Sequence, residues 1–118
     1  AAFRHNIRSH LTTEGYGDIS LADLGNQDDW LLSQEKEEGP IVLLDMSGYG
    51  PNALKYLQKI KERNALAIVI ALVPKHQLNL EISAMRYGAF DDIQVPFYWS
   101  ELSRKIQEAR KSLKKREA

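Results

Sequence analysis

The sequence predicts an α/β domain built on a doubly wound parallel sheet, and three observations carry this prediction. Four consecutive apolar residues, 41–44, lie between a Gly-Pro pair and a turn rich in Gly and Pro. Such a run is too short for a buried helix and is typical of a strand covered on both faces. A second apolar run, Ala65 to Val73, ends at Pro74. Segments with helical spacing alternate with these runs, which is typical of a parallel sheet flanked by helices.

The elements before the central strand are predicted from spacing. Phe3, Ile7 and Leu11 recur every fourth residue, so they share one face of a helix that ends before the next glycine. Apolar and small residues alternate over 19–22, which indicates a short strand. The segment 26–38 contains a Trp and two Leu among acids and amides, and we expect it to be helical.

The elements after the central strand follow the same alternation. Asn52 is a plausible N-cap for a helix that ends at Asn64. Leu78, Ile82 and Met85 have the spacing of a helix, and Gly88 is placed to end it. The residues from Phe90 to Val95 form a weaker strand with two acids, closed by Pro96. A last helix is predicted from about Ser100, on the spacing of Leu102, Ile106, Ala109 and Leu113.

The strand count leaves one strand missing. The chain starts with a helix, so four strands are visible, whereas a doubly wound domain needs a strand before that helix. In the order 2-1-3-4-5, the absent strand would lie between 19–22 and the strand that ends at Asp45. A gap there would leave two strand edges unpaired, at a cost on the order of 1 to 3 kcal/mol for each buried backbone group. We therefore hypothesise that a first strand lies upstream of Ala1, and direct pairing of the two strands would contradict this.

Composition limits the classes of partner. The chain has 118 residues, enough for one domain spanning 1–118, and its sixteen basic and sixteen acidic side chains cancel. No strong overall field draws it to nucleic acid or to an anionic membrane. It has no cysteine, which excludes disulfides, thiolate metal sites and a Cys nucleophile. With no signal peptide and no apolar run long enough to span a bilayer, we expect a cytoplasmic protein.

Asp45 stands directly after the central apolar run. The carboxyl ends of the strands form the crevice in which open α/β sheets bind ligands, so an acid in this place suggests function. The alternative is that Asp45 caps the turn that follows. Position alone leaves both interpretations open.

Four features in order resemble the receiver domain of bacterial two-component response regulators, which has a flavodoxin-like (βα)5 fold. They are the strand Ile41 to Asp45, Gly50 in the following turn, the sequence Arg86-Tyr87-Gly88-Ala89 at a helix end, and Pro96-Phe97. The resemblance runs from Phe3 to the end of the chain. It implies that Asp45 is the phosphoacceptor, that Mg²⁺ is held by Asp45 and the backbone carbonyl of Ser47, and that a histidine kinase or phosphotransfer protein lies upstream.

Other positions depart from the family pattern. Counting back from Pro96, Val95 replaces the Lys, Val73 replaces the Thr or Ser that reports phosphorylation, and Asp92 replaces the aromatic switch residue. The family's acid pair belongs to the first strand, outside this sequence. Phosphoryl transfer requires that charge on the phosphoryl oxygens be neutralised, and each preorganised donor is worth roughly 2.7 to 4 kcal/mol. Val95 supplies no cation and Val73 no hydrogen bond, so we expect a degenerate phosphorylation site.

The aromatic residues Tyr98 and Trp99 stand where the family usually has a small polar helix cap. They either pack over the last helix or form part of a docking surface, since aromatic anchors are enriched at interfaces. The resemblance places a dimer face on the last strand and the last two helices, which favours the second interpretation. The basic residues of the last helix alternate with acids, so we interpret them as a solvated face or as the start of a linker to an output domain.

Two functions agree with these observations. One is a receiver-like signalling module of a two-component or phosphorelay system that acts by protein contact, with atypical or absent phosphorylation of Asp45. The other is a phosphorylation-independent pseudo-receiver that serves as a dimerisation or docking module. No motif supports an enzyme on this fold, and we expect no catalytic activity.

Overall fold

The computed structural model describes residues 7, 9–11, 13, 15, 19–22, 41–46 and 51–117. It contains a parallel sheet of four strands in the order β1-β2-β3-β4. The strands are β1 (Ile19–Ala22), β2 (Ile41–Asp45), β3 (Ile68–Pro74) and β4 (Asp91–Val95), and the helices are α3 (Pro51–Arg63), α4 (Leu78–Arg86) and α5 (Trp99–Glu117). The predicted α/β class with a parallel sheet is confirmed. The helix expected over 26–38 lies outside the described residues.

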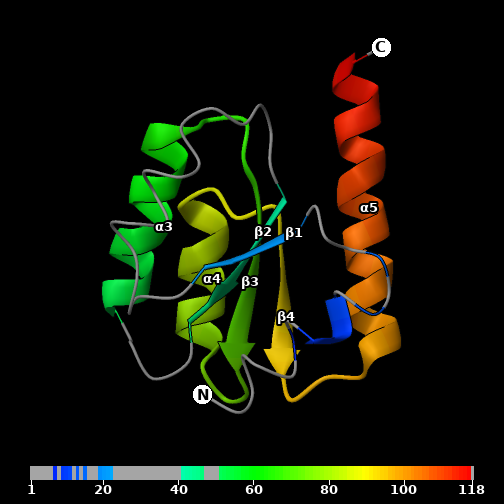
Figure 1. Ribbon diagram of the computed structural model, residues 1–118. Coiled ribbons are helices and arrows are strands. Elements are labelled where there is room, and N and C mark those ends of the chain that lie inside the picture. The colour runs from blue at the N-terminus through cyan, green and yellow to red at the C-terminus, as the bar shows by residue number, and fades with distance from the viewer. Residues whose placement is uncertain are drawn as a thin grey trace.

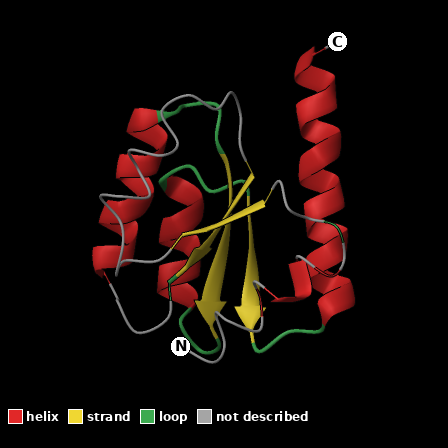
Figure 2. Cartoon of the chain, viewed as in Figure 1, coloured by secondary structure: helices red, strands yellow, loops and turns green. Residues whose placement is uncertain are grey.

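Helices cover both faces of the sheet. Figure 1 shows α3 and α4 on one side and α5 on the other, and Figure 2 shows the same layers by type of element. Residues 7, 9–11 and 13 are helical, and buried Ile7 and Leu11 belong to the apolar cluster that α5 covers. The two faces of β2 and β3 therefore pack into two separate hydrophobic cores. Alternate residues of β3 divide between them, with Val69, Ala71 and Val73 facing α3 and α4, and Ile68, Ile70 and Leu72 facing α5.

The continuous apolar runs form the two central strands, as predicted. All five residues of β2 are buried, and β3 is buried up to its last residue. The strand β3 begins at Ile68, three residues later than its apolar run, because Asn64 closes a turn there. The Asn64 carbonyl accepts a hydrogen bond from the N–H of Ala67 at 3.1 Å, and the Asn64 side chain accepts one from the N–H of Leu66 at 3.1 Å.

The helix boundaries agree with the sequence within one or two residues. The helix α3 begins at Pro51, so Asn52 lies inside its first turn and the predicted N-cap is wrong. Proline is well tolerated at the first helical position because its missing N–H has no partner there. Gly88 follows α4 with φ +105°, and its N–H donates to the Met85 carbonyl at 3.2 Å. The glycine thus ends the helix as predicted.

The strands β1 and β2 pair directly, so the expected gap between them is closed. Ile19 pairs with Ile41, and the register continues to Ala22 and Leu44. The hypothesis of an upstream strand that fills this place is therefore wrong. The physical reason is the cost of unpaired backbone groups: the N–H and C=O groups along the facing edges of β1 and β2 form hydrogen bonds with each other. The described strands follow the chain in order, without the reversal of the order 2-1-3-4-5.

Candidate functional site

Asp45 ends β2 at the carboxyl edge of the sheet, as predicted. It pairs with Leu72 of β3, which pairs in turn with Ile93 of β4. The N–H of Met46 donates to the Leu72 carbonyl at 3.0 Å, which continues the ladder beyond Asp45. Strand alternation places Asp45 on the same face as Leu43, the face covered by α5. Only 2% of Asp45 is exposed, so a phosphodonor reaches its carboxylate only if this edge opens.

Val73 is the last residue but one of β3 and Val95 is the last residue of β4, and the two side chains face opposite sides of the sheet. Val73 is fully buried in the cluster beneath α3 and α4. Val95 is half-buried against the cluster beneath α5. In register, Val95 pairs with Pro74, the residue after Val73. Both positions contribute aliphatic groups to the cores, and neither offers a polar atom to Asp45.

The described residues do not by themselves fit a magnesium ion. Mg²⁺ takes oxygen ligands in an octahedral arrangement, commonly with one or two carboxylates and several waters. No cluster of three or more His, Cys, Asp or Glu residues able to hold a metal occurs in the part of the chain that the structure describes. Ser47, the second expected ligand, lies outside that part. Asp45 is therefore the one predicted ligand whose position is described, and the magnesium site stays a prediction.

Asp92 does not face Asp45. It pairs in register with Ala71, on the face that α4 covers, and its side chain lines the same hollow as that of Glu81 on α4. Burial, a hydrogen bond to Glu81 and the charge of Glu81 raise the pKa of Asp92 to about 6 from its ordinary 3.8. Lys105 partly offsets this rise. The acid at the aromatic switch position therefore interacts with α4 rather than with the phosphoacceptor position.

Tyr98 and Trp99 have different environments although they are adjacent. Trp99 is half-buried, stacks on His10 with ring centroids 3.9 Å apart, and meets Phe97 edge-on at 5.4 Å. Tyr98 is 82% exposed. Of the two aromatic residues predicted for an interface, Tyr98 is the one whose ring is available to a partner.

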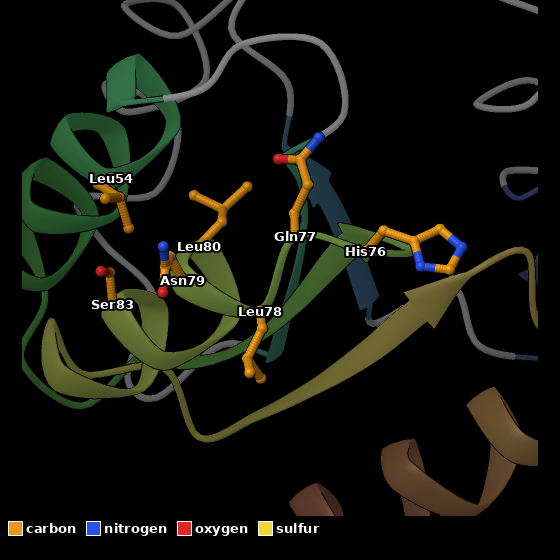
Figure 3. A pocket seen from close by; sticks show the side chains of 7 residues that line it. All are labelled: Leu54, His76, Gln77, Leu78, Asn79, Leu80 and Ser83. Atoms are coloured by element: carbon orange, nitrogen blue, oxygen red, sulfur yellow. The ribbon is translucent and has the colours of Figure 1, made fainter.

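A cavity of about 550 Å³ lies between the first turns of α3 and α4. Figure 3 shows Leu54 from α3 near Asn79, Leu80 and Ser83 from α4, with the ring of His76 pointing away from them. Both helices begin at the carboxyl edge of the sheet, because each follows a strand. Apart from His76 and Ser83 the lining is amide and aliphatic, and it contains no acid. The His76 ring points away from Ser83 (Figure 3), so the two do not form a nucleophile and its activating base. This cavity suits contact or ligand binding better than catalysis.

A second, polar hollow of about 400 Å³ lies along β4, the last strand at that edge of the described sheet. Residues from the β3–α4 loop, α4, β4 and α5 line it. The charged ones are Lys75, Glu81, Asp92, Glu101 and Lys105. Sequence analysis missed Glu81 and Lys105, because helical spacing identifies the buried face of a helix but not the strand residue opposite each polar side chain.

Solved structures that are similar in shape to this chain include a response regulator. Two crystal structures of NtrX from Brucella abortus, one in complex with ADP, match with a TM-score of 0.63 and 26% identity over 85% of this chain. The chain spans 28% of the length of those NtrX chains. The receiver domain of the same NtrX, crystallised alone, matches with a TM-score of 0.58 and 23% identity, over 78% of this chain and 97% of that one.

Sequence comparisons give no further relative: no protein-family model matches the chain, and no curated protein matches it significantly. Among the described residues, every helix is too short or too polar to cross a bilayer. The fold, the acid at the end of β2 and the near-complete overlap with an isolated receiver domain agree with the resemblance found in the sequence. The chain therefore has a fold similar to that of the receiver domains of response regulators.

Proposed function

We propose that this domain is a signalling module of a two-component or phosphorelay system that acts by protein contact, with atypical or absent phosphorylation of Asp45. The single observation that carries the proposal is the burial of Asp45 at the end of β2. An acceptor carboxylate must meet its phosphodonor in line, with cationic and hydrogen-bonding groups around the transferred phosphoryl. Asp45 is 2% exposed, and the positions of the expected cation and hydroxyl are Val95 and Val73.

The proposed output surface consists of α4, β4 and the start of α5. Here α4 exposes Leu78, Ile82 and Met85, whose exposed fractions are 64%, 44% and 42%. Tyr98 extends the apolar area at the start of α5. Exposed apolar side chains that gather in one area are typical of contact surfaces. An upstream histidine kinase or phosphotransfer protein, and a second copy of the chain, are the partners that the receiver-like fold suggests.

A second candidate function is a phosphorylation-independent docking or dimerisation module. The same exposed apolar residues of α4 favour it, because a contact surface of this kind can bind a partner whether or not Asp45 is phosphorylated. The two candidates share an output surface and differ in whether Asp45 is ever modified.

The test is intact mass after incubation with acetyl phosphate and Mg²⁺, on the parent chain and on Asp45→Asn. We expect no adduct in either protein, or an adduct in the parent that forms at least a hundredfold more slowly than in an ordinary receiver tested alongside, in line with the loss of one donor. Circular dichroism of both proteins serves as the folding control. Rapid, labile phosphorylation of the parent that is absent from Asp45→Asn would overturn the proposal.

A further inference from the structure

Two carboxylates meet where β4 packs against α4. The side chains of Asp92 and Glu81 line the same hollow, and a hydrogen bond to Glu81 is among the causes that raise the pKa of Asp92. The side-chain amide of Gln94, two residues along β4 and on the same face, donates to Glu81 Oε2 at 3.4 Å. A hydrogen bond between two carboxyl groups requires a proton on one of them, because two ionised carboxylates are both acceptors. Direct contact between these two carboxyl groups therefore depends on one bound proton.

The neighbouring acid on β4 has the opposite partner. Asp91 points to the other face, where its Oδ2 lies 3.0 Å from Nζ of Lys105 on α5. Figure 1 shows β4 with α4 on one side and α5 on the other. Consecutive residues of one strand thus meet a cation on α5 and a carboxylate on α4. Only the contact with α4 turns from attractive to repulsive when a proton leaves.

The charges around Asp92 come from every element packed against it. Glu81 on α4 and Asp91 on β4 disfavour its ionisation, and Lys105 on α5 favours it. Lys75 from the β3–α4 loop and Glu101 from α5 line the same hollow. On β3 the register neighbours of Asp92 and Gln94 are Ala71 and Val73, which carry no charge. One cation close enough to act on Asp92 therefore opposes two acids, and the hollow is open to the solvent that supplies the proton.

We propose that Asp92 and Glu81 form a proton-operated latch that holds α4 to β4 when protonated and loosens it when both carboxylates are ionised. Asp92 occupies the position where the family has an aromatic switch residue. The latch also adjoins the exposed apolar residues of α4, because Ile82 directly follows Glu81 in the helix. The inference that a loosened α4 changes what the domain binds rests on the proposed function. The latch itself does not.

Asp92 loses its proton over a defined range of pH. With the pKa of Asp92 raised to about 6, the proton is held at pH 5 and largely lost at pH 7.5. Repulsion between the carboxylates then replaces their hydrogen bond. No phosphoryl group, metal or partner is needed for this change, so it can be measured on the isolated chain.

The experiment combines a carboxyl titration with hydrogen exchange. Carbon-detected NMR follows the Asp92 side chain from pH 4 to pH 8 in the parent and in Glu81→Gln. Amide protection factors, which are corrected for the intrinsic pH dependence of exchange, are measured for α4 and α5 at pH 5 and pH 7.5. The variants are Asp92→Asn and the matched control Asp91→Asn, which removes the neighbouring acid on the opposite face.

We expect Asp92 to titrate near pH 6 in the parent and lower in Glu81→Gln. Protection of α4 should fall about threefold from pH 5 to pH 7.5, in the range of a partly exposed charge pair, while α5 changes little. This fall should vanish in Asp92→Asn and persist in Asp91→Asn. Titration of Asp92 near pH 4, or an α4 response that Asp91→Asn abolishes, would overturn the latch. If Asp92→Asn does not fold, the titrations of the parent and Glu81→Gln decide alone.

Failure of the latch is distinguishable from failure of the proposed function. The titration and exchange measurements contain no phosphodonor and no partner. Rapid phosphorylation of Asp45 would overturn the proposed function and leave these results unchanged.

Discussion

Asp92 on β4 lines the same hollow as Glu81 on α4, while Asp91, the preceding residue, is paired with Lys105 on α5 at 3.0 Å. One strand therefore carries two acids whose partners have opposite charge. The pair with Lys105 resembles an ordinary stabilising contact, whereas the pair with Glu81 stabilises the fold only when a proton is bound.

The first prediction concerns the pH dependence of stability. The pKa of Asp92 is raised in the folded state to about 6 from 3.8, so the folded chain binds this proton more tightly than the unfolded chain. Its stabilisation is fully present below about pH 4 and is lost as pH rises through 6. Asp92→Asn, which cannot ionise, should exceed the parent in free energy of unfolding by on the order of 1 kcal/mol at pH 8, after allowance for solvent screening. In urea titrations this difference should shrink at pH 4.5, and a difference independent of pH would contradict the assignment.

The second prediction concerns the pair on the opposite face. Lys105→Met leaves Asp91 without its cation, and both side chains are largely buried, with 14% and 27% exposed. We expect a loss of about 1 kcal/mol in the free energy of unfolding at pH 7, read from urea unfolding. Arg104→Met is the matched control, because its pair with Glu108 is 61% and 45% exposed. Equal losses of unfolding free energy in the two variants would show that the partly buried position of Lys105 does not strengthen its ion pair.

The third prediction concerns Val73, which faces the cluster beneath α3 and α4. Val73→Thr restores the family's hydroxyl but places it in a fully buried apolar environment. The cost should be about 1 to 3 kcal/mol, measured by thermal or urea unfolding. Because the side chain points to the opposite face from that of Asp45, the hydroxyl should not accelerate reaction with acetyl phosphate. Faster phosphorylation of Val73→Thr would show that the strand ends are arranged differently.

The fourth prediction separates the two aromatic neighbours. Trp99→Ala removes the ring that stacks on His10 and packs against the α5 core, and should cost about 2 kcal/mol of stability, less than for a fully buried ring. Tyr98→Ala removes an exposed ring and should leave the unfolding midpoint unchanged. If the α4–β4–α5 surface binds a second copy, Tyr98→Ala should weaken that association in sedimentation velocity. A large loss of stability in Tyr98→Ala would contradict this division.

The central strands were predictable because their signal is local. A run such as 41–44 is apolar throughout, so both of its faces must be covered, and Asp45 then falls at the carboxyl edge of the sheet whatever the strand order. Gly88 was predictable for a similar reason, since a glycine that follows helical spacing is placed to take the positive φ that ends a helix.

Strand pairing and cross-element contacts were not predictable from these patterns. Alternation shows that Asp91 and Asp92 face opposite sides, but it does not say which helix covers each side, so the partners Lys105 and Glu81 were missed. The expected gap beside β1 came from the general strand order of doubly wound sheets rather than from these residues. Direct pairing of Ile19 with Ile41 depends on long-range contacts that a sequence window does not contain.

Sedimentation velocity with and without acetyl phosphate and Mg²⁺ decides whether this domain signals by contact without an ordinary phosphorylation switch. We expect one sedimentation coefficient for the parent and for Asp45→Asn at each protein concentration, unchanged by the phosphodonor. A shift that appears only with acetyl phosphate and is lost in Asp45→Asn would overturn the proposed function, because it would show that Asp45 controls assembly.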